Sequence, residues 1–405
     1  MKIKNLRLEK HNDCVRAVAT VSWEDCQQKE RDIYFETIPE FSGDLVSNPN
    51  SFLIACILPA MYYGEKRIKI DEEICPILKE GLRTNMSWFH YWYGKKYTPV
   101  DIEAKKSLTY KTSQTPKGIG LFLSGGVDSL FSLRVNRLDF PVHHPASIRD
   151  CFIVHGFDIH HDENSPYNLQ TFERALATSR KVAKDAQANL IPVYTNVRHL
   201  ASNIDFWMHC FFAAALSSVA HAFAPRLSKI TISSDGFVSD TVPWGSHPLI
   251  DPNYSSFDLQ VQHGIFRKRL EKIKVIADWD TALQNLRVCT NNPEGLLNCG
   301  SCEKCIRTMT MILAAGKLHQ TKAFPANDVS PELLSEVTIK DKKSYLSDYY
   351  YALVPALTEI GREDLARVLK NELGLKGDLK RFDRKYLNRN LTKAWGILRK
   401  FILRK

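Results

Sequence analysis

The chain has 405 residues, of which 44% are hydrophobic and 25% charged, with 19 glycines and 18 prolines. These values are ordinary for globular proteins, so they exclude a disordered chain, a fibrous repeat and a small disulfide scaffold. The length predicts two or three domains. Nearly all of the net charge of +10 lies in residues 373–405, which contain eleven Lys and Arg residues but only two Asp residues.

Three features bear on the cellular compartment. The first ten residues lack the apolar segment of a signal peptide. Residues 206–224 are apolar over the length of a membrane span, but they include His209 and His221, so we predict a buried helix instead. Six of the ten cysteines are scattered and four lie within residues 289–305, as is typical of reduced thiols plus one metal site. We therefore expect a cytoplasmic protein.

Residues 1–115 are predicted to form an α+β domain that recognises a substrate or a partner. Period-two alternation predicts strands at residues 14–23 and 31–38, and residues 51–63 are apolar enough for a buried helix. We expect a second helix from Asp71 to Tyr93, with Asp71 as its N-cap and acidic residues in its first turn.

The end of this second helix is rich in aromatic side chains. We interpret them as core and domain interface or, alternatively, as a stacking wall for a planar ligand. They are Trp88, Phe89, Tyr91, Trp92 and Tyr93. Residues 108–117 are polar and rich in turn formers, which is typical of a linker.

Residues 116–320 are predicted to form an α/β domain with a doubly wound parallel sheet. Apolar runs that suit strands buried on both faces alternate with helical stretches such as residues 169–188. These runs are residues 118–123, 150–159, 190–197 and 227–233. Residues 321–405 are predicted to be a helical C-terminal region that ends in the basic tail. Its expected helices are residues 331–337, 343–357 and 362–373.

The motif Ser124-Gly125-Gly126-Val127-Asp128-Ser129 follows the first of these strands and opens a helix. The glycines let the backbone N–H groups approach a ligand, and the helix N-terminus adds donors and a positive dipole end. Ser124 and Ser129 add hydroxyl donors, and Asp128 suits a Mg²⁺ ion held against phosphates. The sequence therefore predicts a pyrophosphate cradle, which matches neither a Walker A loop nor a dinucleotide fingerprint.

A second motif consists of four cysteines, Cys289, Cys299, Cys302 and Cys305. Four thiolates at this density predict a tetrahedral metal site, with Zn²⁺ preferred over an iron–sulfur cluster. Gly300 allows the tight turn between the second and third cysteines. Because four protein ligands complete the coordination, we expect the site to be structural.

The SGGVDS motif resembles the PP-loop of the N-type ATP pyrophosphatases, a superfamily with a HUP-like α/β fold. Its members cleave ATP between the α- and β-phosphates, adenylate a carboxylate or carbonyl oxygen, and let a nucleophile displace AMP. A PP-loop followed by Cys…CGxCxxC is most similar to 7-cyano-7-deazaguanine synthase, over about residues 116–315. The resemblance implies an AMP-forming C–N ligase that uses ATP and Mg²⁺ and carries a structural Zn²⁺.

The resemblance also implies roles for single residues. Ser124, Asp128 and Lys272 would be catalytic, with Arg269 and Lys274 as alternatives to Lys272. The other interpretation of these three basic residues is that they are ordinary surface residues of an amphipathic helix. ATP would contact the loop residues together with Gly156, Phe157, Asn196 and Arg198. The loop members of this set are Ser124, Gly125, Gly126, Asp128 and Ser129.

After the fourth strand we expect the carboxylate or acyl-acceptor pocket, because α/β sheets bind ligands at the carboxyl ends of their strands. The alternative is a rigidly packed loop. The candidate residues are Asp235, Gly236, Trp244, His247 and Asp251. This loop and the large first domain differ from the deazaguanine synthases, which indicates a larger substrate or a partner protein.

The carboxylate stays open, with a 7-deazaguanine acid as one candidate. Lys2 stands where one glutaminase type has its cysteine, so the nucleophile would be ammonia or an amine, including one on a protein. The first alternative function is an RNA-modifying enzyme of the thiolation type, which would need Cys151 or Cys210 for sulfur transfer. The second is a non-catalytic nucleotide-binding partner in a system like the antiphage clusters that encode some relatives.

Partners are also indicated by the basic tail. Its charges and its aromatic residues suit nucleic acid or an anionic membrane surface, or the segment is a solvated helix. We further expect a homo-oligomer or a complex member.

Overall fold

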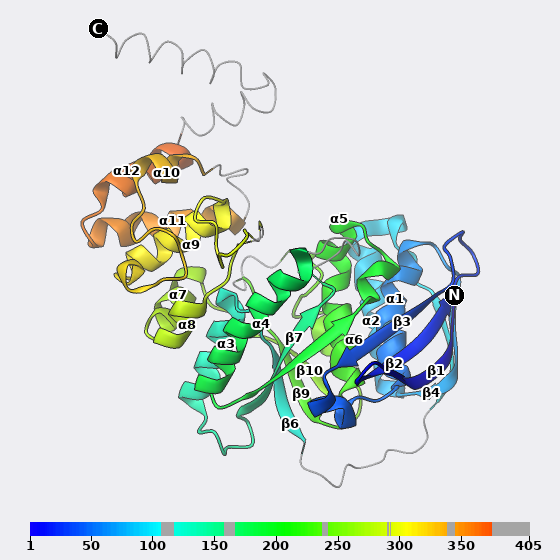
Figure 1. The fold of residues 1–405 in the computed structure, drawn as a ribbon. Coiled ribbons are helices and arrows are strands. Elements are labelled where there is room, and N and C mark those ends of the chain that lie inside the picture. The colour runs from blue at the N-terminus through cyan, green and yellow to red at the C-terminus, as the bar shows by residue number, and fades with distance from the viewer. Residues whose placement is uncertain are drawn as a thin grey trace. The chain divides into compact units, whose positions relative to one another are not determined.

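The computed structural model describes residues 1–106, 117–157, 167–236, 242–289, 291, 293–337 and 345–374. The expected linker and the basic tail lie outside these residues, apart from Lys117. The chain forms two compact units, Met1–Phe266 and Arg267–Lys405 (Figure 1).

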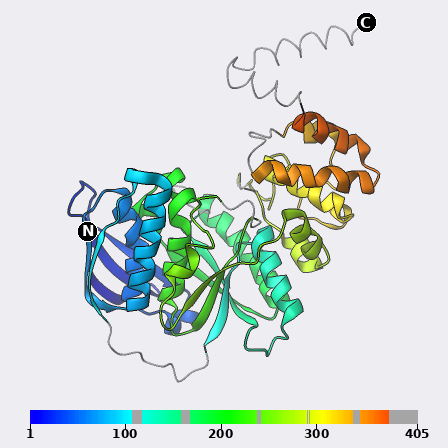
Figure 2. The same ribbon diagram turned by 180° about the vertical axis from the view of Figure 1, so that it is seen from behind.

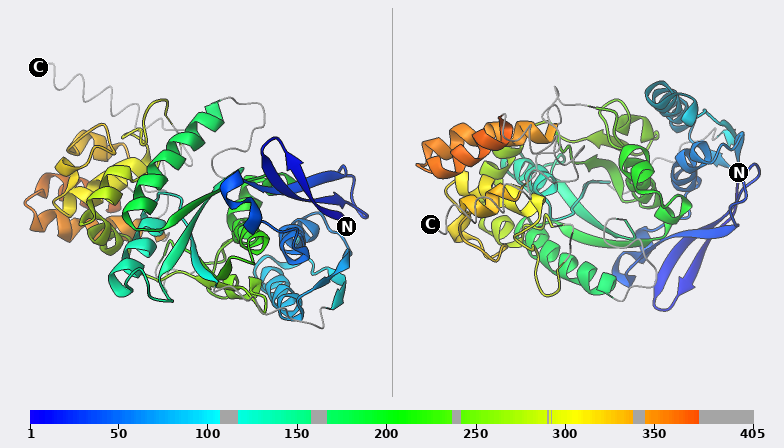
Figure 3. Two further views of the ribbon diagram at one scale, coloured as in Figure 1. Left: turned by 60° about the horizontal axis from the view of Figure 1, so that its bottom comes forward. Right: turned by 90° about the horizontal axis from the view of Figure 1, so that it is seen from above.

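The first unit contains one sheet and the helices that cover it. Its strands are β1 Lys2–His11, β2 Cys14–Ser22, β3 Arg31–Thr37, β4 Arg67–Ile74, β5 Asp101–Lys106, β6 Gly118–Phe122, β7 Ile148–His155, β8 Asn189–Thr195, β9 Leu227–Ile232 and β10 Gln260–His263. Its α-helices are α1 Pro49–Tyr62, α2 Pro76–Tyr93, α3 Val127–Asp139, α4 Tyr167–Asp185, α5 Ile204–Phe206 and α6 Phe212–Ala222. Helices α3 and α4 cover one face, and α1, α2 and α6 cover the other (Figures 2 and 3).

The strand order is β10-β9-β6-β7-β8-β3-β2-β1-β4-β5. Strands β10, β9, β6, β7 and β8 run parallel to one another, which confirms the α/β class and the predicted parallel strands. Strand β3 then joins β8 in antiparallel pairing, and β2 and β1 continue antiparallel. Strands β4 and β5 run parallel to β1.

The expected domain boundary near residue 115 falls inside this compact unit. Strand β3 pairs with β8 through Phe35 and Thr195, so the N-terminal strands extend the parallel sheet instead of forming a separate one. This pairing satisfies the backbone groups that β8 would otherwise expose as an edge strand. One hydrophobic cluster contains buried residues of both α1 and α6, so the core is continuous as well. The two helices are also joined by a 2.7 Å hydrogen bond that Ser51 donates to the Ser218 carbonyl.

The prediction of a helix that starts at Asp71 is wrong. Residues 67–74 form β4, with Ile68, Ile70 and Ile74 buried, and α2 begins only at Pro76 with Cys75 as its N-cap. Proline fixes φ and lacks an N–H, so it favours the first helical turn. By contrast, β2, β3 and α1 agree with the sequence predictions to within about two residues.

The predicted segment 206–224 is helical as far as Ala222 and is packed inside the first unit. The segment runs from α5 through a π-helical turn, Trp207–Phe211, into α6, and most of its residues are buried. Within the described residues, no helix has the length and apolar character needed to cross a membrane. The prediction of a buried helix is therefore confirmed.

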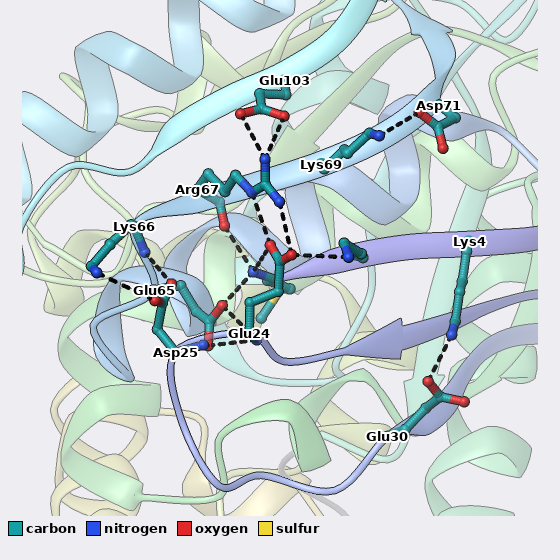
Figure 4. A network of polar contacts seen from close by, with 12 residues as sticks. Lys4, Glu24, Asp25, Glu30, Glu65, Lys66, Arg67, Lys69, Asp71 and Glu103 are labelled. Carbon is teal, nitrogen blue, oxygen red and sulfur yellow. Dashed lines mark hydrogen bonds and ion pairs between the residues drawn. The ribbon is translucent and has the colours of Figure 1, made fainter.

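A buried ion pair anchors the first strand. The Met1 ammonium group contacts the carboxylate of Glu65, and both groups are fully buried (Figure 4). The same ammonium group donates a hydrogen bond of 2.9 Å to the Arg67 carbonyl, and the Glu65 carboxylate also accepts hydrogen bonds from the backbone N–H groups of Glu24 and Asp25. These contacts tie the start of β1 to β4.

The second unit is helical in the part that the structure describes. Its α-helices are α7 Arg269–Ala277, α8 Asp280–Asn285, α9 Glu303–Ala314, α10 Pro331–Ser335, α11 Tyr345–Glu359 and α12 Glu363–Leu373. The expected boundary at residue 320 falls within this unit, because α9 packs against both α7 and α11. The cysteine segment thus shares a compact unit with the C-terminal helices.

Candidate functional site

The SGGVDS motif lies at the reversal point of the parallel sheet. From β6 the chain proceeds through β7 to β8 on one side, and later returns to β9 and β10 on the other side of β6. Open α/β sheets bind ligands in the crevice at the carboxyl ends of the strands where the order reverses in this way. Ser124 to Ser129 follow the carboxyl end of β6, so the structure places the motif where the sequence predicts a ligand site.

Two glycines shape the loop and the start of α3. Gly125 has φ +75°, which its lack of a Cβ allows, and Gly126 is the N-cap of α3. The Ser124 hydroxyl accepts a 3.3 Å hydrogen bond from the Gly126 N–H, and the Ser129 hydroxyl donates one of 3.1 Å to the Gly126 carbonyl. No side chain in the described part of the chain caps α3, so the helix start suits an anion.

Asp128 and Ser124 of the motif suit the predicted chemistry. Asp128 lies half-buried in the first turn of α3, and Ser124 is exposed two residues after the end of β6. The hydroxyls of Ser124 and Ser129 lie 3.3 Å apart. A carboxylate and two hydroxyls at a helix start are a donor set that fits a hard cation with its phosphate ligand.

The segment expected to contact adenine follows β7. Gly156 has φ +100°, and a Cβ there would lie 1.9 Å from the carbonyl oxygen of Thr195. Only glycine allows this approach of the chain to β8. Phe157 is buried, with its ring 5.1 Å from that of Trp207.

Asn196 and Arg198 are both engaged with the protein itself. The Asn196 amide donates to the Asp32 carbonyl and accepts from the Tyr34 N–H, which extends the junction between β8 and β3. Arg198 is buried, donates a 2.5 Å hydrogen bond to the Phe157 carbonyl and lies 4.7 Å from the Trp207 ring. This geometry favours structural roles for both side chains over contact with phosphate.

The expected substrate residues divide into two groups. Asp235 is exposed and Gly236 half-buried shortly after β9, at the same sheet edge as the SGGVDS motif. Trp244 lies 4.7 Å from the ring of His209. His247 and Asp251 are buried, and burial lowers the pKa of His247.

Helix α2 packs against this loop through its aromatic end. The ring of Trp92 lies 5.0 Å from that of His247, and the Tyr93 hydroxyl lies 3.2 Å from the carbonyl oxygens of His209 and Pro243. These contacts favour the interpretation of Trp92 and Tyr93 as core and interface over the stacking wall, whereas Tyr91 is 78% exposed. They also give the N-terminal region a part in holding the loop.

Two residues near Asp251 were missed by the sequence predictions. His263 Nδ1 lies 2.7 Å from Asp251 Oδ2, and the Ser246 hydroxyl donates a 2.6 Å hydrogen bond to the same oxygen. A usable signal was the pair His263-Gly264 at the end of a short strand-like segment. Strand β10 brings this histidine to the sheet edge.

In the second unit, the four predicted cysteines form one cluster. All four Sγ atoms lie within 4.8 Å of one another, with 3.9 Å between Cys289 and Cys302 and 3.8 Å between Cys299 and Cys305. A tetrahedron with Zn–S bonds of about 2.3 Å has edges of about 3.8 Å. The four thiols therefore fit a Zn²⁺ ion. Gly300, at φ +75°, forms the turn between two of them.

Hydrogen bonds favour the thiolate form at one corner of the cluster. Although burial opposes ionisation of the Cys299 thiol, hydrogen bonds from the Ser301 hydroxyl and from the Ser301 and Cys302 N–H groups lower its pKa to about 6. Burial raises the pKa of the Cys302 and Cys305 thiols. A bound cation would favour ionisation of all four.

Lys272 lies in α7 and is fully buried, so its interpretation as a surface lysine is wrong. Lys274 is exposed, and the Arg269 guanidinium lies 5.6 Å from the Tyr349 ring. Burial of a lysine is costly and uncommon without partners. Among the three basic candidates, burial therefore singles out Lys272.

Comparisons of the chain with protein-family models, curated proteins and solved structures find no match. The resemblance to the PP-loop pyrophosphatases therefore rests on the sequence motifs alone.

Proposed function

We propose that this protein is an ATP-dependent, AMP-forming ligase of the PP-loop type, related to 7-cyano-7-deazaguanine synthase. The observation that carries the proposal is the SGGVDS loop at the reversal point of the parallel sheet, with Gly125 at positive φ and α3 starting at Val127. This placement supports a pyrophosphate site, because the loop and helix N–H groups converge where such sheets bind ligands.

In the first step, a carboxylate oxygen attacks the α-phosphorus of ATP, and the bond to pyrophosphate breaks. The loop N–H groups and the hydroxyls of Ser124 and Ser129 hold the leaving pyrophosphate. Asp128 would hold a Mg²⁺ ion, which would supply positive charge against the phosphates. In the second step, ammonia or an amine attacks the acyl carbon and displaces AMP.

The substrate would lie beyond β9, near Asp235 and Gly236. Trp244, His247 and Asp251 form the packed base of this region, against α2. Because the N-terminal region helps to build this base, we propose one of two substrates. Either the acid is larger than a free deazaguanine, or the acceptor of the acyl group belongs to a partner protein. A 7-deazaguanine acid remains the first candidate to test.

In the second unit we propose a structural Zn²⁺ bound by the four cysteines. The spacing of the sulfur atoms and the low pKa of Cys299 support it. By analogy with the lysine-bearing segment of the deazaguanine synthases, Lys272 stays a candidate catalytic residue, and its burial distinguishes it from the exposed Lys274.

The alternative of RNA thiolation is not favoured. It needs an accessible, readily ionised thiol near ATP. Cys151 and Cys210 are buried, and burial raises the pKa of each thiol to about 12. The alternative of a non-catalytic nucleotide-binding partner predicts that the protein binds ATP without cleaving it.

The test is mass spectrometry of ATP reactions with candidate acids and ammonium, for AMP, pyrophosphate and the amide. Asp128→Ala should abolish Mg²⁺-dependent turnover and keep the fold. Asp139→Ala, an exposed aspartate at the other end of α3, is the matched control and should keep activity. Wild-type turnover in Asp128→Ala would contradict the PP-loop assignment. ATP binding without cleavage by the wild-type protein would support the non-catalytic alternative.

A further inference from the structure

A buried carboxylate orients a histidine at the candidate ligand-binding edge of the sheet. Asp251 is completely buried, and its Oδ2 atom lies 2.7 Å from Nδ1 of His263, whose side chain is 9% exposed. The other carboxylate oxygen accepts a hydrogen bond of 3.1 Å from the His247 N–H. Because the carboxylate accepts at Nδ1, the proton of a neutral His263 sits on Nδ1, and Nε2 carries the lone pair.

The nearby serine does not make this a hydrolase triad. In such a triad the serine contacts Nε2, opposite the nitrogen that the aspartate holds. Here the Ser246 hydroxyl donates to Asp251 Oδ2 and lies 3.5 Å from Nδ1, on the side of the ring that faces the aspartate. Ser246 therefore helps to fix the carboxylate, and within the described residues no hydrogen bond to His263 Nε2 is present.

The strand register places His263 near the PP-loop. His263 is level with Ile232 of β9, and Thr231 is level with Leu121 of β6. His263 is therefore level with Phe122, two residues before Ser124, at a distance of two strand spacings, or about 10 Å.

The backbone beside His263 is tightly packed. The Gly264 N–H donates a 2.7 Å hydrogen bond to the Ile232 carbonyl, and a Cβ on Gly264 would lie 2.7 Å from the Ser234 nitrogen. This contact fixes the end of β10 against the end of β9.

We propose that His263, held by Asp251, accepts a proton from the amine in the second step of the ligase reaction. This inference rests on the proposed function. The amine lone pair attacks the acyl carbon, a C–N bond forms, and the C–O bond to AMP breaks with its electron pair leaving on the phosphate oxygen. One N–H proton passes to His263 Nε2 and then to water. Asp251 is a positioning residue that stabilises the imidazolium.

His247, the histidine singled out from the sequence, is less suited to this role. Its Nδ1 accepts a 3.1 Å hydrogen bond from the Leu249 N–H, and its ring packs edge-on against Trp92. These contacts hold His247 inside the loop. The pair Asp251 and His263 thus gives the substrate region a proton acceptor.

The first test separates the two steps of the reaction. The full-length protein is given MgATP, ammonium chloride and 7-carboxy-7-deazaguanine, and both ATP–pyrophosphate exchange and amide formation are measured. His263→Ala should keep exchange within about twofold of wild type and lose about 100-fold or more in amide formation. Added imidazole should restore part of the loss. The control His143→Ala, at an exposed histidine, should change neither.

The second test needs no substrate. Long-range ¹H–¹⁵N NMR of the histidine rings should show the Nδ1–H tautomer for His263, and Asp251→Asn should shift the ring towards the Nε2–H tautomer. An Nε2–H tautomer in the wild type, or amide formation at the wild-type rate in His263→Ala, would overturn the inference. Absence of both exchange and amide from the wild type would instead count against the proposed function with this acid, and the tautomer would still decide the role of His263.

Discussion

The side-chain oxygen of Asn298 accepts hydrogen bonds from the backbone N–H groups of Cys289 and Val288, at 3.1 and 2.8 Å. Its amide nitrogen donates to the carbonyls of Leu286 and Ala323. Asn298 is 1% exposed and directly precedes Cys299. One buried amide therefore fixes the chain at the first two cysteines of the proposed metal site, which lie ten positions apart.

Asn298→Ala should lower the free energy of unfolding by about 2 kcal/mol or more, because it leaves buried N–H and carbonyl groups without partners. It should also lower the zinc content, since supporting hydrogen bonds orient metal ligands. Thermal unfolding and elemental mass spectrometry would measure both effects. Asn371→Ala, at an exposed position of α12, is the control. Equal losses in the two variants would contradict a supporting role for Asn298.

The purified protein should contain about one Zn²⁺ per chain, as a single Cys₄ site does. Cys302→Ser and treatment with a chelator should each lower the unfolding temperature, because the free energy of metal binding adds to that of folding. The measurement is metal analysis combined with calorimetry. A metal-free protein of normal stability would contradict the zinc site, and visible absorbance from a brown protein would indicate an iron–sulfur cluster instead.

Glu65→Gln should destabilise the first unit by about 3 to 5 kcal/mol, because it leaves the buried Met1 ammonium group without its carboxylate. Although burial opposes ionisation, that ammonium group and two backbone N–H groups lower the pKa of Glu65. Its stabilising effect is thus complete above the ordinary pKa of Glu, about 4.3, and is lost as the pH falls through the lower folded-state value. Glu65→Gln should flatten this acid dependence.

The control for Glu65 is Glu30→Gln. Glu30 forms an ion pair of 2.8 Å with Lys4, and both side chains are about half exposed (Figure 4). Exposed pairs contribute about 1 kcal/mol or less. Urea unfolding at pH 7 and at about pH 3 would compare the variants, and a loss from Glu65→Gln at pH 7 no larger than that from Glu30→Gln would show that the buried pair is not needed.

The sequence predicts four of the five parallel strands, β6 to β9, because these strands lie inside the sheet and appear as continuous apolar runs; the short edge strand β10 was missed. Both chemical motifs are contiguous or nearly so, which makes Ser124 to Ser129 and the four cysteines visible without a structure. The end of strand β4 was predicted to be helical because Asp71, Glu72 and Glu73 are typical of a first helical turn. Its pairing with β1 and β5 outweighs that local preference.

Contacts between distant segments were out of reach of the sequence. Phe35 and Thr195 lie 160 positions apart, and nothing in the sequence around either residue indicates that they pair. The N-terminal region was therefore predicted to be a separate domain. Asp251 and His263 are joined only when β10 pairs with β9. The burial of Lys272 likewise depends on packing, because its neighbours Glu271 and Lys274 are exposed.

Gly156→Ala should destabilise the protein by about 3 kcal/mol, through both the left-handed backbone and the approach of the new Cβ to within 1.9 Å of the Thr195 carbonyl oxygen. The matched control is Gly64→Ala. Gly64 has φ +72° but no heavy atom within 4 Å of its would-be Cβ, so it should cost only the backbone strain, about 1 kcal/mol. Because Thr195 is paired with Phe35 of β3, its carbonyl is held in place and the Gly156 segment should shift instead, so Gly156→Ala should also weaken ATP binding, whereas Gly64→Ala should not. Urea unfolding and ATP titration calorimetry would measure the two effects. Equal destabilisation by both variants would show that the contact between Gly156 and Thr195 is not tight, and unchanged ATP affinity in a folded Gly156→Ala protein would remove this segment from the proposed adenine site.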